Sequence, residues 1–185
     1  MRNNVTGSEN IFVALGVKAD LSHYPYSMVF PLKEKISFAE NEFSELKIYN
    51  YSKYSGYAPK DCASLTCILL CPCYDYWKRA KEELAKKFID SLSKFVPEIT
   101  QETVEVCDVA TPLTYERYCS SYQGSWMSIW KPKTSRFQYP QTIKNLEGVY
   151  FAGQRIMMPG GLPIAVYTGR RAVQLLCRDN KIEFV

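Results

Sequence analysis

The spacing of hydrophobic and polar positions predicts several strands in the first two thirds of the chain. Residues 9–17 form a short run of apolar and β-favouring residues, which is typical of a buried strand. Apolar and polar residues alternate over 46–54 and again over 102–110, as in strands with one buried face, and the apolar run 63–71 predicts another strand. The pattern therefore favours a sheet whose strands are joined by turns containing Gly and Pro.

Helical spacing is found in two segments before residue 120. Asp75 is placed to cap a helix that runs to about Phe95 and is ended by Pro97, because apolar residues share one face and Lys and Glu fill the other. The apolar residues of that face are Trp77, Leu84, Phe88, Leu92 and Phe95. A short helix is predicted at 112–119, with its proline in the first turn, where no amide hydrogen bond is lost.

The C-terminal third combines an aromatic segment with a strand and a long helix. Residues 120–141 are aromatic without a clean period, so we expect a long loop. Residues 146–153 predict a strand, and 160–177 predict a glycine-led helix. The whole order predicts an α+β fold: a mixed, mostly antiparallel β-sheet with helices packed on it over residues 1–145, and a C-terminal strand and helix over 146–185.

Composition narrows the class of protein. The chain has 185 residues, of which 46% are hydrophobic and 23% charged, enough for a globular domain with a real core. The net charge of +4 is mild and basic residues alternate with acidic ones, as in 78–87, so no nucleic-acid interface is predicted. No apolar run approaches the roughly 20 residues of a membrane span, and polar residues stand where an export signal would be apolar. We therefore expect a cytoplasmic protein.

Cysteine and histidine provide little evidence for catalysis. Four of the seven cysteines lie close together in and beyond the apolar run, at Cys62, Cys67, Cys71 and Cys73. Their spacing fits no common zinc motif, so we expect packed, reduced thiols and no metal, with a zinc or thiol-redox site as the alternative. His23 is the only histidine, which makes a hydrolase triad improbable.

Glycines surround the start of the last predicted helix. Gly153 ends the predicted strand, where the absence of a side chain lets a ligand or another backbone approach closely. Gly160 and Gly161 precede the helix and Pro163 fits its first turn. The free amides there, at the positive end of the helix dipole, suit an anion or an electron-rich ring edge. The alternative is a glycine cap followed by an ordinary packed helix.

The segment GVYFAGQRIMMPGGLPIAVYTGRRAVQLL, residues 148–176, resembles the closing FAD-contacting segment of the phytoene desaturase, carotenoid isomerase and retinol saturase group of flavin-dependent oxidoreductases. Earlier stretches resemble the same group in the same order, so the resemblance covers nearly the whole chain. These stretches are 9–17, 20–22, 58–66, 74–77, 108–118 and 122–126.

The resemblance implies noncovalently held FAD and hydride transfer to or from a hydrophobic, unsaturated, carotenoid- or retinoid-like substrate. It places the end of the strand near the ribityl-pyrophosphate and the helix start at the pyrimidine end of the flavin ring. The implied cofactor-binding residues are Gly153, Gln154, Gly160, Gly161, Leu162 and Pro163. Because the flavin performs the transfer, no protein residue is assigned as catalytic.

The aromatic loop is the candidate substrate region. Tyr122, Trp126 and the nearby Met158 are the implied substrate-binding residues. The loop could instead form a partner surface or simply cover the core. A hydrophobic substrate could also bring the protein into peripheral contact with a membrane.

The chain departs from the family pattern in one respect. Its nine glycines include no GxGxxG motif, the loop that holds the FAD pyrophosphate. We therefore expect a C-terminal portion of a larger enzyme that lacks its dinucleotide-binding half, binds FAD weakly and is inactive alone. The small residues Ala165, Gly169 and Ala172 on the last helix could then form a homodimer contact. The alternatives are a non-enzymatic domain that binds an apolar ligand or protein partner, and an inert folded fragment.

Overall fold

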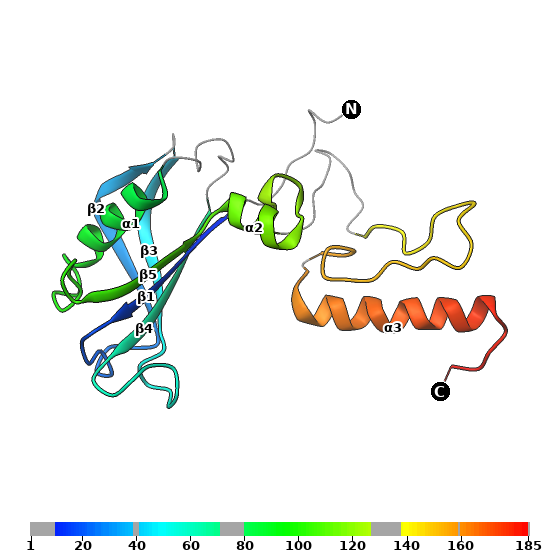
Figure 1. Ribbon diagram of the computed structural model, residues 1–185, viewed down its shortest axis with the longest axis horizontal. Coiled ribbons are helices and arrows are strands. Elements are labelled where there is room, and N and C mark those ends of the chain that lie inside the picture. Colours follow the sequence, from blue (N-terminus) through cyan, green and yellow to red (C-terminus); the bar gives the residue numbers. More distant parts are fainter. Residues whose placement is uncertain (1–9, 39–40, 71–79, 127–137, 159, 185) are drawn as a thin grey trace. The chain divides into compact units, whose positions relative to one another are not determined.

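A computed structural model describes residues 10–38, 41–70, 80–126, 138–158 and 160–184. The described residues fall into two compact units: an N-terminal unit that extends to Gly124 and a C-terminal unit that starts at Ser125 (Figure 1).

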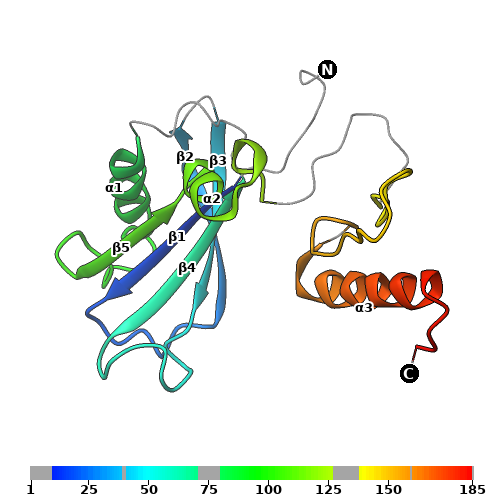
Figure 2. The same ribbon diagram turned by 45° about the vertical axis from the view of Figure 1, so that its right-hand side comes forward.

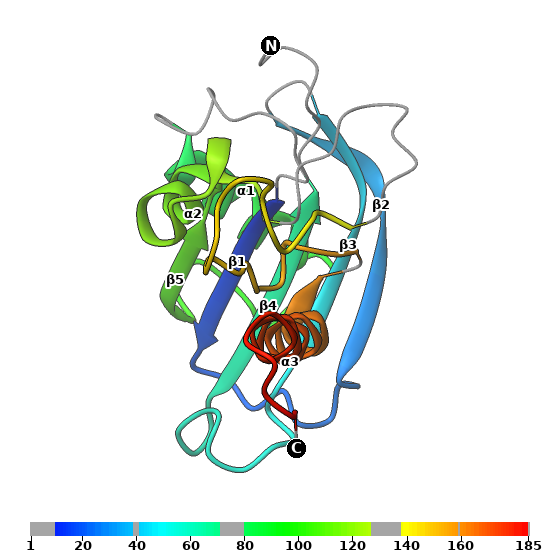
Figure 3. The same ribbon diagram turned by 90° about the vertical axis from the view of Figure 1, so that its right-hand side faces the viewer.

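The N-terminal unit is built on a five-stranded antiparallel sheet with the order β2-β3-β4-β1-β5 (Figure 3). Its strands are β1 (Asn10–Val17), β2 (Ser27–Phe38), β3 (Asn41–Asn50), β4 (Ala63–Leu70) and β5 (Val104–Ala110). β1 pairs with β4 and β5, and β3 pairs with β2 and β4, each time antiparallel. β2 and β5 are thus the two edges of the described sheet. The predicted α+β class is confirmed.

Alternation along the strands creates the core. On β1, Ile11, Val13, Leu15 and Val17 are buried, while the residues between them are half-buried. Helix α1 (Lys81–Leu92) packs on the buried face and contacts β2 and β5 (Figure 2). Its buried residues are Leu84, Phe88, Ile89 and Leu92. The core therefore lies between one sheet face and α1, as the apolar face of the predicted helix indicated.

Two short helical elements close the N-terminal unit. α2 (Pro112–Cys119) begins with a capping box in which Thr111 and Thr114 each serve the other's backbone amide. The single turn η2 (Tyr122–Gly124) follows and packs against α2. The short helix predicted at 112–119 is confirmed, with Pro112 in its first turn.

The other predicted elements of this unit differ from the observed ones mainly at their ends. The strands predicted at 9–17, 63–71 and 102–110 are confirmed as β1, β4 and β5, whereas 46–54 covers only the second half of β3. β2 was not predicted. Helix α1 ends at Leu92, and Phe95 lies beyond it in a turn, stacked 4.9 Å from Phe30 between ring centroids. The proposed cap, Asp75, lies outside the described residues.

The C-terminal unit consists of the long helix α3 (Gly161–Asp179) and the irregular segment before it. The predicted helix at 160–177 is confirmed. The strand predicted at 146–153 is wrong, because the described residues offer this apolar segment no neighbouring strand to pair with. Among the described residues of the C-terminal unit, β-type pairing is limited to two isolated bridges, Gln138 with Met157 and Ile143 with Leu146. Of the predicted loop 120–141, residues 127–137 lie outside the described chain.

Candidate functional site

The start of α3 has the backbone geometry that its two glycines permit. Gly160 precedes the helix with φ 85° and ψ −161°, and Gly161 follows with φ 80°, conformations that other L-residues rarely adopt. No side chain in the described part of the chain caps this end. The amides of Gly160, Gly161 and Leu162 have no acceptor within the helix, and Pro163, in the same first turn, has no amide to satisfy. The helix therefore presents backbone donors at the positive end of its dipole.

Thr168 joins the second turn of α3 to the preceding segment. Its side chain is fully buried, and its hydroxyl accepts a hydrogen bond of 3.0 Å from the Gly153 amide. The same hydroxyl donates to the Ile164 carbonyl oxygen at 2.7 Å. Gly153 is thereby held against the helix, which fixes both ends of the loop that carries the predicted cofactor residues.

Gln141 forms a second link to α3. Its side-chain amide donates to the carbonyl oxygens of Phe151 at 2.8 Å and Thr168 at 2.7 Å, and its backbone carbonyl accepts from the Phe151 amide at 2.8 Å. One glutamine thus occupies the backbone groups of Phe151 that a neighbouring strand would use. Its buried Oε1 atom has no hydrogen-bond partner among the described residues. A single glutamine in a loop carries no sequence signal for this role, so the sequence did not predict it.

Gly153 leaves open space beside the backbone. Its φ is 135°, and a Cβ atom built there would meet nothing within 4 Å. Because its amide is already bonded to Thr168, a ligand at this position would meet the Cα side of the residue. The neighbouring Gln154 is exposed, as is Leu162 at the helix start. The C-terminal unit contains all six predicted cofactor-binding residues, at the two ends of one loop.

The predicted substrate residues are divided between the two units. Tyr122 belongs to the N-terminal unit, whereas Trp126 and Met158 belong to the C-terminal unit. All three side chains are partly exposed, with 41%, 38% and 37% of their surface accessible.

A hollow of about 300 Å³ lies on the sheet of the N-terminal unit, and the sequence did not indicate it. Apolar and small side chains from β1, β4, β5 and the loop before β4 form most of its lining. They include Ala14, Gly16, Tyr57, Cys62, Ser64 and Val106. Its size is at the lower end of small-molecule sites, and its surface suits an apolar group.

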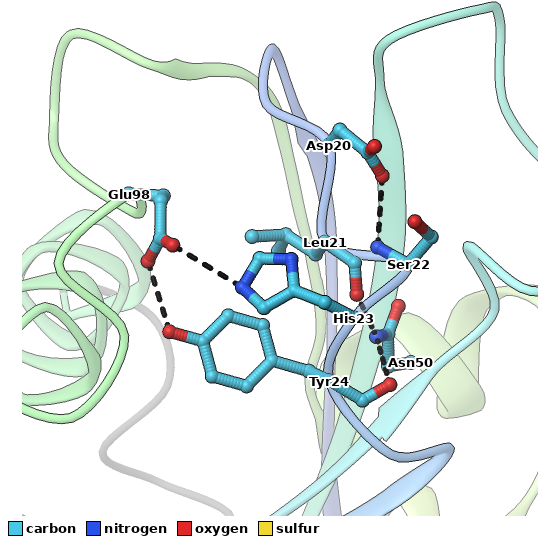
Figure 4. A network of polar contacts seen from close by, with 7 residues as sticks. All are labelled: Asp20, Leu21, Ser22, His23, Tyr24, Asn50 and Glu98. Atoms are coloured by element: carbon cyan, nitrogen blue, oxygen red, sulfur yellow. Dashed lines mark hydrogen bonds and ion pairs between the residues drawn. The ribbon is translucent and has the colours of Figure 1, made fainter.

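The single histidine takes part in a structural network (Figure 4). Glu98 accepts a hydrogen bond from the Tyr24 hydroxyl at 3.1 Å and lies 3.5 Å from His23 Nε2. Burial, followed by the bond to Glu98, raises the pKa of Tyr24. Asn50, fully buried, donates to the Leu21 carbonyl oxygen at 2.9 Å. The network ties the turn after β1 to β3 and to the loop before β5, and the partner of His23 is an acid, not a nucleophile.

Of the four cysteines considered as a metal site, two lie in the part of the chain that the structure describes, Cys62 and Cys67. Cys67 is buried in the core, and burial raises its pKa to about 12, so its packing role is confirmed. Cys62 is half-buried, and Cys71 and Cys73 lie outside the described residues. Within the described part of the chain, no group of three or more His, Cys, Asp or Glu is placed to hold a metal ion.

An uncapped, glycine-led helix start tied to a loop glycine is suited to an anionic or dinucleotide-type cofactor. A comparison with protein families agrees with this class: the profile described as flavin containing amine oxidoreductase matches residues 20–177. The match covers most of the chain, and the protein belongs to this family of flavin-dependent oxidoreductases. No curated protein matches the chain. Over the described residues, no helix is both long enough and apolar enough to cross a membrane.

Proposed function

We propose that the chain is the C-terminal part of an FAD-dependent oxidoreductase that transfers hydride between a hydrophobic, unsaturated, carotenoid- or retinoid-like substrate and the flavin. Membership of the flavin-containing amine oxidoreductase family supports the flavin chemistry. The resemblance of residues 148–176 to carotenoid- and retinoid-converting enzymes supports the narrower substrate class.

The observation that carries the proposal is the start of α3, fixed to Gly153 through Thr168. The donor set fits a flavin: the first backbone amides of α3 have no helical acceptors, and a Cβ atom at Gly153 would meet nothing within 4 Å. When bound, FAD supplies the hydride-accepting and hydride-donating ring. The amides of Gly161 and Leu162 would orient its electron-rich edge, and the helix dipole would stabilise negative charge there by about 1 kcal/mol.

A second wall of the cofactor site must come from other residues. The sequence has no GxGxxG turn, and the described amides at α3 offer a site for only one part of a dinucleotide. In this proposal a dinucleotide-binding half supplies the pyrophosphate loop, and this chain contributes the wall at Gly153 and Gly161. We expect weak FAD binding by the chain alone.

The substrate side of the proposal rests on apolar, partly exposed side chains. Tyr122, Trp126 and Met158 would contact a hydrophobic substrate and exclude water from it. Substrates of this kind partition into bilayers, so the working enzyme would be a cytoplasmic protein in peripheral contact with a membrane.

FAD retention through gel filtration tests the cofactor part. The coding sequence upstream of Met1 should contain a strand followed by GxGxxG. We call the upstream half and residues 1–185 expressed as one chain the joined protein. The joined protein should retain FAD and show its visible absorbance, whereas residues 1–185 alone should not. Stoichiometric FAD on residues 1–185 would overturn the two-wall arrangement, and a joined protein without FAD would overturn the flavin function.

A matched pair of variants locates the site. Gly161 and Gly148 both have positive φ and open space or ordinary contact around a Cβ position. Replacing either with Val adds the same bulk and comparable backbone strain, but only Gly161→Val would obstruct the cofactor wall. We expect Gly161→Val to lose FAD from the joined protein and Gly148→Val to retain it.

One observation favours the second candidate, a domain that binds an apolar ligand without a cofactor. The hollow beside Gly16 and Val106 is apolar and lies in the N-terminal unit, away from the glycine-led helix in sequence. Titration of residues 1–185 with retinol, followed by ligand fluorescence, separates the two. Tight saturable binding that Gly16→Leu removes, in a protein whose joined form binds no FAD, would favour this candidate.

A further inference from the structure

Five tyrosine rings contact one another at the open end of the β2–β3 hairpin. One ring directly precedes β2, one lies near the end of β3, and three belong to the loop between β3 and β4. They are Tyr26, Tyr49, Tyr51, Tyr54 and Tyr57, which we call the tyrosine cluster. All five belong to the N-terminal unit, so their contacts require nothing from the C-terminal unit.

Tyr26 and Tyr51 form the inner pair of the tyrosine cluster. Their ring centroids are 5.5 Å apart and their ring planes meet at 80°. A hydrogen bond with Tyr51, followed by burial, raises the pKa of Tyr26, so the two hydroxyl groups also meet. The ring carbons next to the two hydroxyl-bearing carbons are therefore neighbours.

The backbone holds the inner pair in place on both sides. The Asn50 amide donates to the Tyr26 carbonyl oxygen at 2.7 Å, next to the paired ends of β2 and β3. The Tyr51 amide donates to the Ser64 carbonyl oxygen of β4 at 2.9 Å. The sheet thus anchors both tyrosines, and the contact between their rings is a property of the folded state.

Each inner ring also contacts an outer ring. Tyr57 stacks on Tyr51 with 5.3 Å between centroids and 16° between planes. Tyr54 lies 5.7 Å from Tyr26 and 6.0 Å from Tyr57, which closes a circuit of four rings. Tyr49 joins this circuit 5.6 Å from Tyr26. Because all members are the same phenol in direct contact, an electron lost from one ring can be replaced from its neighbour.

We propose that the tyrosine cluster is a site of oxidative modification, at which a one-electron oxidant driven by hydrogen peroxide joins Tyr26 to Tyr51 as dityrosine. The outer rings pass the oxidation inward, and the inner pair traps it in a covalent bond. The inference goes beyond the proposed function and does not depend on FAD.

The reaction removes two electrons and two protons from the inner pair. Tyr26 and Tyr51 each lose one electron to the oxidant and the phenolic proton to water, which leaves one radical on each ring. A carbon–carbon bond forms between the two neighbouring ring carbons, which share the unpaired electrons. The hydrogen on each of these carbons then moves to the phenolic oxygen and restores the phenol. Hydrogen peroxide takes up the two electrons and two protons and becomes two water molecules.

The crosslink would join the segment before β2 to the segment after β3. A covalent link between distant positions restricts the unfolded chain, as a disulfide does. The modified protein should therefore unfold at a higher urea concentration than the unmodified protein.

Oxidation of residues 1–185 by a haem peroxidase and hydrogen peroxide tests the proposal. We expect dityrosine fluorescence in the monomer fraction. Trypsin should release residues 19–33 bonded to residues 48–53, lighter by two hydrogen atoms than the separate peptides together. Fragment masses should place the bond on Tyr26 and Tyr51. A bond on Tyr24 or Tyr49, or dityrosine found only between molecules, would overturn the proposal.

Tyr26→Phe and Tyr118→Phe form a matched pair. Each substitution removes one hydroxyl and keeps the ring, but Tyr118, which is 73% exposed, does not belong to the tyrosine cluster. We expect Tyr26→Phe to lower the yield of intramolecular dityrosine at least tenfold and Tyr118→Phe to leave it unchanged. Tyr51→Phe should repeat the loss, with circular dichroism of both inner variants matching the wild type. Equal yields from Tyr26→Phe and Tyr118→Phe would contradict the assignment.

The double variant Tyr54→Phe, Tyr57→Phe tests the inward transfer. Phenylalanine keeps the ring contacts but is not oxidised by a peroxidase, so the bond between Tyr26 and Tyr51 should form at least twofold more slowly and at the same positions. An unchanged rate would overturn the role of the outer rings.

Discussion

The backbone amide of Gly153 donates a 3.0 Å hydrogen bond to the hydroxyl of Thr168, fifteen residues later in the second turn of α3. This bond fixes a loop glycine to the helix whose N-terminus we propose as one wall of a cofactor site. The C-terminal unit thus holds its shape through polar contacts of buried groups, where the sequence pattern suggested a paired strand.

Thr168→Val should destabilise the C-terminal unit. The substitution keeps the side-chain shape but removes the hydroxyl, and the Gly153 amide loses its acceptor, at a cost of about 1–3 kcal/mol. Amide hydrogen exchange of residues 161–179 should accelerate accordingly. Thr168→Ser keeps the hydroxyl and should remain close to the wild type. Equal protection of α3 in the Val variant would show that the bond contributes nothing.

Asn50→Asp should weaken the N-terminal unit, and more so at neutral pH than in acid. A buried carboxylate would face the Leu21 carbonyl oxygen, to which the Asn50 amide now donates at 2.9 Å. Loss of the donor and burial of the charge should lower the free energy of unfolding by about 2 kcal/mol or more at pH 7.

The pH dependence of Asn50→Asp follows from the direction of its pKa. Complete burial and the facing Leu21 carbonyl would raise the pKa of the introduced carboxyl by more than the two bonds that Asn50 Oδ1 now accepts from Ser52 would lower it, so the native state binds more protons than the unfolded state. The deficit relative to the wild type should therefore shrink as pH falls from 7 toward 4, as measured by urea unfolding. Asn145→Asp, an exposed control with the same charge change, should show little of either effect. A deficit that grows in acid would contradict the assignment.

Gly124→Ala should be far more damaging than Gly56→Ala. Both residues have positive φ, but a Cβ at Gly124 would collide with the Pro112 backbone, while one at Gly56 meets nothing within 4 Å. We expect a loss of about 3 kcal/mol for Gly124→Ala and about 1 kcal/mol for Gly56→Ala. Chemical unfolding monitored by circular dichroism gives both values. Similar losses would mean that α2 and η2 can separate at little cost.

Cys67 should resist alkylation in the native protein at pH 8, whereas the exposed Cys119 should react. Burial raises the Cys67 pKa from 9.0 to about 12. Its reactive thiolate is therefore scarce, and the core blocks access. Iodoacetamide labelling with mass spectrometry should modify Cys67 only in denaturant.

The same shift predicts a loss of stability in base. Between pH 9 and 12 the folded state keeps a proton that the unfolded state has released, so the free energy of unfolding should fall as pH rises. Cys67→Ala should lack this contribution to the slope. Equal native labelling of Cys67 and Cys119 would contradict its placement in the core.

The sequence predicted elements whose hydrophobic period reflects one packed face. β1 and β4 alternate buried and half-buried residues, and α1 gathers its apolar residues on one side. β2 was not predicted because Lys33, Glu34 and Lys35 interrupt its alternation of apolar and polar residues. An edge strand tolerates such charged residues. Strand propensity at 146–153 was misleading because a strand also requires a neighbour.

The candidate site was predictable only in part. Gly160, Gly161 and Pro163 carry local signals for a helix start, since each restricts the backbone in a known way. The contacts of Thr168 and Gln141 join residues 15 and 27 positions apart, and no periodicity encodes such pairings. Side-chain hydrogen bonds across a loop become visible only in three dimensions.

The two edge strands of the N-terminal sheet, β2 and β5, have features that oppose edge-to-edge aggregation. β2 carries Pro31 and the charged run 33–35, and its pairing with β3 shifts register between Pro31 and Ile36. On β5, Glu105 and Asp108 lie within 3.7 Å of lysine ammonium groups. To pair with either edge strand, an extended segment of another molecule would have to desolvate these charged side chains and match an irregular backbone. We therefore expect this sheet to resist edge-to-edge aggregation at concentrations at which a sheet with flat, uncharged edge strands would aggregate.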